Sequence, residues 1–152
     1  MDAQTTTSGE VVERARGKRR GLRAALVELE DAVSAAGEPE VWSGRVSLAL
    51  VKVRRALDGH VEATESPDGL LADAVHQEPR LAHHADVLRR EHVELYRGID
   101  EATQRLGRVA GRGEATVEQE RLLALLAQFT RHRHRGAQLV YDAYNTDISV
   151  GD

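Results

Sequence analysis

Apolar residues recur along most of this chain at steps of three and four positions, the period of a helix that turns one face to a core. The pattern predicts four long helices, over about residues 10–36, 41–65, 80–109 and 116–144. Residues 70–76 are long enough for two further helical turns. No segment alternates as a strand does, so the sequence predicts an all-α protein.

Capping and turn residues separate these helices. Thr7–Glu10 and Thr116–Gln119 both place a hydroxyl three residues before Glu or Gln, the capping box that begins a helix. Pro39 suits the first turn of the second helix, because a first-turn residue needs no backbone N–H. Residues 66–69 are expected to form a turn and residues 111–113 a break, because they contain the Gly and Pro residues that interrupt helices.

Four long helices with short connections predict an up-down-up-down four-helix bundle. The longer connection, residues 66–78, holds a short extra helix between the second and third long helices. A chain of 152 residues has the size of one domain. We expect a disordered N-terminal tail at residues 1–9, the bundle at 10–145 and a C-terminal tail at 146–152.

Three of the predicted helices place a histidine on the apolar face, where the pattern leads us to expect a hydrophobic residue. The three are His60 in the second helix, His92 in the third and His132 in the fourth. A polar group buried without a partner costs about 1–3 kcal/mol, so each imidazole needs one. His92 lies 17 residues before the end of its helix and His132 lies 16 after the start of the next. At the helical rise per residue, these two side chains should lie side by side.

The position of His60 along the bundle axis can be interpreted in two ways. It lies five residues before the end of its helix, whereas His92 lies about 12 beyond the start of the next, a mismatch of roughly 10 Å. Either the crossover absorbs the mismatch and the three histidines converge, or His60 lies level with His84 and Asp142. Both arrangements are histidine–carboxylate clusters in a bundle, a setting in which metal sites are built. The other histidines fall outside the apolar stripes: His76, His83 and His134.

The order of these residues resembles the hemerythrin-like family over about residues 10–145. Members are four-helix bundles with a non-haem di-iron centre held by histidines and bridging carboxylates. The resemblance implies metal ligands at His60, Glu65, His92 and His132, and iron, mononuclear or dinuclear, as the cofactor.

The chain departs from the family pattern at several points. The usual histidine of the first helix is absent. The family has Glu four residues after the second-helix histidine, whereas Glu65 follows His60 by five. The carboxylate expected five residues after His132 is Ala137. The donors that remain, three nitrogens and one carboxylate, are enough for one metal ion.

Composition excludes several other classes of function. The chain has no cysteine, which excludes disulfides, thiolate catalysis and zinc–thiolate sites. Its net charge of −4 gives no general attraction to nucleic acid or to anionic membranes. The arginines of residues 14–23 form either a nucleic-acid patch or a solvated helix face, and the lack of interleaved aromatic residues favours the solvated face.

Neither a signal peptide nor an apolar run of about 20 residues is present, so we expect a cytoplasmic protein with no membrane partner. Nineteen of the 21 basic residues are arginine, a bias typical of GC-rich bacterial genomes.

Two functions from different classes are consistent with the sequence. The first is a hemerythrin-like metal-binding bundle, with non-haem iron, that binds or senses oxygen, peroxide or nitric oxide. The second is a metal-free bundle whose buried histidines form a polar network and which binds a protein partner or acts as a scaffold. Patterns for a Ser-His-Asp triad, a phosphate-binding loop or a zinc protease are absent, so binding is expected rather than catalysis.

Overall fold

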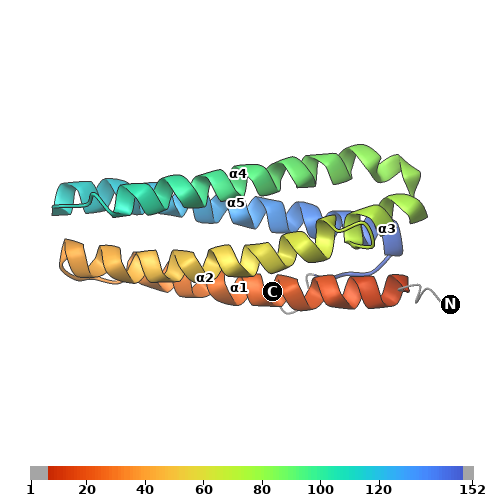
Figure 1. Ribbon diagram of the computed structural model, residues 1–152, viewed down its shortest axis with the longest axis horizontal. Coiled ribbons are helices and arrows are strands. Elements are labelled where there is room, and N and C mark those ends of the chain that lie inside the picture. The colour runs from red at the N-terminus through yellow and green to blue at the C-terminus, as the bar shows by residue number, and fades with distance from the viewer. Residues whose placement is uncertain (1–6, 149–152) are drawn as a thin grey trace.

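The structure, a computed structural model, describes residues 7–148 and places most of them in four long helices that lie side by side (Figure 1). Among residues 7–148 there is no strand, so the predicted all-α class is confirmed. The long helices are α1 (Ser8–Ser34), α2 (Pro39–Glu65), α4 (Ala82–Leu106) and α5 (Arg112–Tyr144). Between α2 and α4 lie the expected short helix, α3 (Leu70–Gln77), and a 3-10 turn, η1 (Pro79–Leu81).

Figure 1 shows the α1–α2 and α4–α5 connections at one end of the bundle and α3 with η1 at the other. α3 is held there by the carboxylate of Asp73. This carboxylate accepts hydrogen bonds from the Ser8 hydroxyl of α1 at 2.9 Å and the Tyr144 hydroxyl of α5 at 2.5 Å. Burial and this bond raise the pKa of Tyr144, so its hydroxyl keeps the donated proton. One carboxylate therefore ties the crossover to the first and last helices.

The residues predicted to begin the helices do so at α1 and α2 and not at α5. Thr7 caps α1 by accepting a hydrogen bond from the Glu10 N–H at 3.2 Å, and Pro39 lies in the first turn of α2. The prediction that the last helix begins at Thr116 is wrong, because α5 begins at Arg112. The Thr116 hydroxyl donates to the Arg112 carbonyl inside the helix instead of capping it. Gly111 takes the extended cap conformation, so one glycine of the expected break serves as the cap.

The helix ends and tails also differ in detail. α1 ends two residues and α4 three residues before the expected ends at 36 and 109. α1 already begins at Ser8, inside the segment expected as a tail. Ile148, in the expected C-terminal tail, is buried against the bundle. The rest of those tails, residues 1–6 and 149–152, lies outside the described residues.

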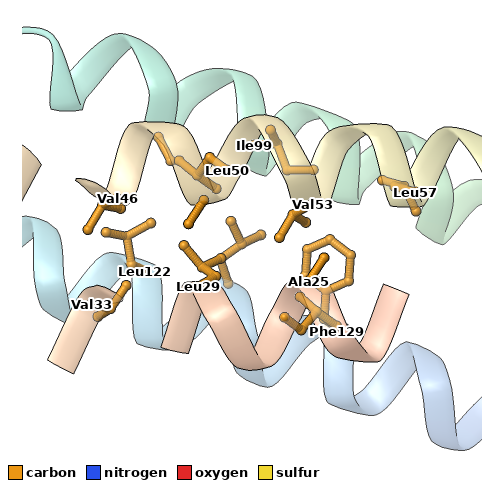
Figure 2. Close-up of a cluster of buried hydrophobic side chains, with 14 of the residues drawn as sticks. Ala25, Leu29, Val33, Val46, Leu50, Val53, Leu57, Ile99, Leu122 and Phe129 are labelled. Atoms are coloured by element: carbon orange, nitrogen blue, oxygen red, sulfur yellow. The ribbon is translucent and has the colours of Figure 1, made fainter. Parts of the chain in front are cut away.

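Two apolar clusters fill the bundle, one above the other along its axis. Figure 2 shows the first, in which side chains of all four long helices meet around Leu29, Leu50, Ile99 and Phe129. The second cluster packs α3 against the long helices, and its members include Val11, Leu70, Leu71, Leu88 and Leu139. α1, α4 and α5 each contribute to both clusters, and α2 contributes to the first and ends near the second. The polar side chains that lie between the two clusters form the candidate site.

The outward faces of the helices carry charged side chains. Arg14 pairs with Glu62 at 2.7 Å and Lys52 with Glu28 at 3.1 Å, and all four side chains are solvent-exposed. Within the part of the chain that the structure describes, no helix is both long and apolar enough to cross a membrane.

Candidate metal centre

His60, His92 and His132 converge at the polar level between the two apolar clusters. The ring centroids lie 5.1 Å apart for His60 and His92, 5.5 Å for His60 and His132, and 4.7 Å for His92 and His132. Each residue offers one ring nitrogen such that all three nitrogens lie within 4.8 Å of one another. His92 and His132 are only 2% and 3% exposed. Three neighbouring helices therefore bring three potential nitrogen ligands to one point.

The crossover absorbs the level mismatch that made the position of His60 ambiguous. His60 lies five residues before the end of α2, and His92 lies ten residues beyond the start of α4. Because their rings are adjacent, α4 must begin about 7.5 Å beyond the level at which α2 ends. η1 and α3 span this offset. The competing residues, His84 and Asp142, do not join the cluster.

Two of the three imidazoles are held by carboxylates. Nδ1 of His92 lies 2.9 Å from Oε2 of Glu65, and Nδ1 of His132 lies 2.9 Å from Oε1 of Glu91. A carboxylate accepts the proton of Nδ1, which leaves a lone pair on Nε2. Arg135 pairs with the other oxygen of Glu91 at 2.6 Å and so holds that carboxylate in turn.

The Nε2 atoms released in this way lie inside the cluster. Nε2 of His132 is 3.3 Å from Nε2 of His60. Two buried ring nitrogens, Nδ1 of His60 and Nε2 of His92, have no hydrogen-bond partner among the described residues. Each such nitrogen costs about 1–3 kcal/mol, which bonding to a metal ion would offset. A carboxylate on one ring nitrogen with the other left open is the usual arrangement of a metal-bound histidine.

Glu65 is placed differently from the other three expected ligands. Its carboxylate contacts Nδ1 of His92, and it does not belong to the group of donors that meet at one point. Glu65 therefore acts on the site by orienting His92. Glu91, which plays the same role for His132, directly precedes His92 in the sequence, but nothing in the sequence pairs it with a residue on α5.

Burial keeps the three imidazoles neutral. It lowers the pKa of His60 well below its ordinary value, and the neighbouring histidines and Arg19 lower it further. Burial, followed by the charges of nearby groups, lowers the pKa of His132 to about 3. The pKa of His92 is also lowered by burial, although its hydrogen bond to Glu65 opposes the shift. Neutral imidazole is the form that binds a metal ion.

Arg19 is a further polar residue at this level, and it was not predicted from the sequence. It belongs to the arginine-rich half of α1 that was expected to face solvent, but it is only 5% exposed. Its Nη1 donates a hydrogen bond to the Arg133 carbonyl at 2.8 Å. The spacing of the apolar residues could have revealed it, because Arg19 follows Ala15 by four residues and precedes Leu22 by three. Ala15 and Leu22 are both buried. The expected solvated face therefore has one inward-facing arginine.

A small cavity of about 30 Å³ adjoins the histidines. Its volume suits a water molecule or a ligand of two or three atoms. All three histidines and Arg19 line it, and the remaining wall is mostly apolar, with Leu70, Leu71, Leu88 and Leu139 among its members. Gly136 also lines it.

Other polar residues near the site in the sequence lie away from this point. Tyr96, one turn after His92, donates instead to the Asp58 carboxylate, and burial with this bond raises its pKa. The histidines that fall outside the apolar stripes are exposed: His76, His83 and His134.

No protein-family model matches the sequence, no curated protein matches it, and no solved structure matches its fold. The function is therefore inferred from the geometry of the site itself.

Proposed function

We propose that this protein is a metal-binding bundle in which His60, His92 and His132 hold one divalent transition-metal ion. The observation that carries the proposal is the pair of carboxylates, Glu65 and Glu91, that accept hydrogen bonds from the outer nitrogens of two buried histidines and leave the inner nitrogens open. Neutral imidazoles suit iron, zinc, copper and nickel. The resemblance to hemerythrin-like proteins favours non-haem iron among these.

Support for one metal ion rather than two comes from the donor set. The group of donors that meet contains three histidines and no carboxylate within the described residues. On α1, where the family places a histidine, the side chain at this level is Arg19. A guanidinium has no lone pair to offer a metal. A divergent, mononuclear member of the hemerythrin-like family, with up-down-up-down helix order, is the form of the proposal that these residues favour.

The surroundings favour binding of a small molecule over conventional hydrolysis. A metal ion on three nitrogens would supply open coordination positions, at which oxygen, peroxide or nitric oxide can bind. The chain's own residues provide the rest: Glu65 and Glu91 orient the imidazoles, and the leucines of the cavity wall exclude bulk water. The cavity of about 30 Å³ limits the size of what can enter.

One contact favours the alternative, a metal-free bundle that binds a protein partner. The Nε2 atoms of His60 and His132 are 3.3 Å apart and can share a proton directly, as in a polar network without metal. In that case the histidines would specify packing and the cavity would have no ligand. Metal content separates the two proposals.

The test is metal analysis of protein purified without a histidine tag, followed by reconstitution with Fe(II), Co(II) and Zn(II) with oxygen excluded. One metal ion per chain supports the proposal, and two per chain would favour the dinuclear centre of the family. Absence of metal after reconstitution would contradict it and favour the metal-free bundle.

Single substitutions locate the site. His60→Ala, His92→Ala and His132→Ala should each abolish or severely weaken metal uptake, because a three-ligand site cannot lose one ligand. The matched controls are alanine substitutions at three exposed histidines, and these should leave uptake intact: His76, His83 and His134. Equal effects from all six would mean that the metal binds elsewhere.

A further inference from the structure

The first half of α2 carries an apolar stripe on its outward face. Val41, Leu48 and Val51 are 53%, 69% and 46% exposed, and Leu48 is the most exposed large apolar side chain among the described residues. Gly44 is exposed as well. These four positions follow one another by three, four and three residues, so they lie on one face of the helix. Apolar residues at this spacing form the seam along which one helix packs against another.

Two ion pairs show that the stripe points directly away from the bundle. Lys52 lies on the side of α1, where it pairs with Glu28 at 3.1 Å. Arg54 lies on the side of α4, where it pairs with Asp100. The opposite face of α2, which includes Val46, is buried in the first apolar cluster. The stripe therefore lies between the two ion pairs, and the described part of the chain leaves it uncovered.

Gly44 leaves room for a side chain of a second helix. A Cβ atom at this position would meet nothing within 4 Å, so packing within the subunit does not require glycine here. Leu48 lies one turn further along the stripe. If two copies of α2 pack antiparallel about a two-fold axis, Leu48 of each copy can lie over Gly44 of the other. The same register sets Val41 of each copy opposite Val51 of the other, so the stripe is complementary to itself.

The charges along α2 favour the antiparallel direction. Glu40 lies in the first turn of the helix, whereas residues 41–57 contain four basic residues and no acidic one. Parallel helices would bring like charges together, and antiparallel helices bring Glu40 of each copy to within about one turn of Arg55 of the other. Glu40 and Arg55 are exposed, and neither forms an ion pair with another of the residues 7–148. Both are therefore available to a second copy.

We propose that the protein forms a homodimer through α2, with the two helices antiparallel, Leu48 over Gly44 and Glu40 beside Arg55. The proposal goes beyond the metal site and does not depend on it, because Val51 precedes His60 by nine residues, about 13 Å along the helix. One helix pair over three turns is a small interface, at the low end of the range for specific association. The dimer is therefore reversible and depends on concentration.

The test is sedimentation equilibrium of the full chain. The wild-type protein should pass from monomer to dimer, with a dissociation constant between about 1 µM and about 1 mM. Leu48→Glu should weaken the dimer by more than about 100-fold, because it sets two carboxylates within the apolar contact. The matched control is Leu123→Glu, at a leucine of α5 that is 47% exposed, and it should dimerise as the wild type does. Circular dichroism checks that both variants keep the helical fold.

Exchange of the charges tests the direction of the helices. Glu40→Arg and Arg55→Glu should each weaken the dimer by roughly 5–30-fold, because each change places like charges at both symmetric contacts. A mixture of the two variants should form a heterodimer about as tight as the wild-type dimer, since every unlike pair forms again. In a parallel dimer neither single change would weaken association.

The register has its own test. Arg45 lies beside Arg45 of the second copy when Leu48 covers Gly44, so Arg45→Gln should tighten the dimer. A weaker dimer in this variant would contradict the register.

Four results would overturn the inference. A wild-type protein that stays monomeric up to about 1 mM does not form this dimer. Equal weakening by Leu48→Glu and Leu123→Glu would place the contact on another surface. Failure of the mixed variants to associate would contradict the antiparallel pairing. Dimerisation should also be the same with a chelator and with Zn(II), so a dimer that requires metal would be bridged by the ion and not by α2. If the protein takes up no metal, the proposed function fails and the dimer is unaffected.

Discussion

At the residue scale, the site depends on which nitrogen of each imidazole carries the proton. Glu65 and Glu91 accept from Nδ1 of His92 and His132, so both histidines present an unprotonated Nε2 to the centre. Without these carboxylates, the rings could adopt the other tautomer or rotate. Loss of either carboxylate should therefore lower the metal affinity without changing the number of ligands.

Replacing Glu65 with Gln should weaken metal binding roughly 10–100-fold, the usual effect of losing the carboxylate partner of a metal-bound histidine. The measurement is competition for Zn(II) against a chelating dye. Glu62→Gln is the matched control, because Glu62 lies on the same helix but is exposed and pairs with Arg14. An effect as large as that of His92→Ala would mean that Glu65 is itself a ligand, as the sequence suggested.

The metal-free protein should lose stability as the pH is lowered below about 6.5. In the folded state the pKa values of His60, His92 and His132 lie below their ordinary value, that of His132 at about 3. Between the folded and unfolded pKa values the unfolded chain binds more protons, so acid favours unfolding. Each histidine adds a slope of about 1.4 kcal/mol per pH unit in that window.

Urea unfolding in the presence of a chelator, at several pH values between about 7.5 and about 5, measures this slope. His132→Gln should make the dependence shallower, whereas His134→Gln, at an exposed position two residues away, should not. Stability that is constant over this range would mean that the histidines are already charged in the fold.

At the element scale, the apolar stripes predicted the helices and the inward direction of His60, His92 and His132. They could not predict the relative level of α2 and α4, because the crossover through α3 and η1 sets it and no period extends across it. Arg19 was missed for a different reason. It lies within a run of charges on α1, so composition suggested solvent although its spacing from Ala15 and Leu22 placed it on the buried stripe.

The close approach of α4 and α5 depends on Gly98. A Cβ atom at this position would lie 2.6 Å from Cδ1 of Leu125, a side chain in the first apolar cluster. Gly98→Ala should therefore be less stable than Gly21→Ala by about 1–3 kcal/mol, the cost of overpacking a core. Gly21 is an exposed helical glycine with open space around it, so its substitution should stabilise by up to about 1 kcal/mol. If chemical denaturation showed that both substitutions raise the free energy of unfolding equally, Leu125 would have to repack freely around the new methyl group.

At the scale of the whole molecule, the polar level divides the core into two apolar clusters. The cluster in Figure 2 fills one part of the bundle, and the cluster around α3 fills the other. A bundle built only for stability would continue the apolar stripes through this level, since buried polar groups are costly unless each has a partner. Four polar residues here, two with carboxylates placed behind them, are consistent with a site that is kept for binding.

Metal binding should therefore stabilise the whole bundle and not only the residues around the site. An ion held by His60, His92 and His132 would join α2, α4 and α5 at the point where the two clusters meet. A ligand that binds only the folded state stabilises it by about 2.7 kcal/mol at a free concentration of 100 times its Kd. Thermal unfolding with and without Zn(II) measures the effect, which should disappear in His92→Ala and persist in His83→Ala.

On metal binding, amide hydrogen exchange should slow in both clusters, including the helix α3 that carries no ligand. If exchange slowed only at the residues next to the histidines, the two clusters would unfold independently and the metal would stabilise only the local structure.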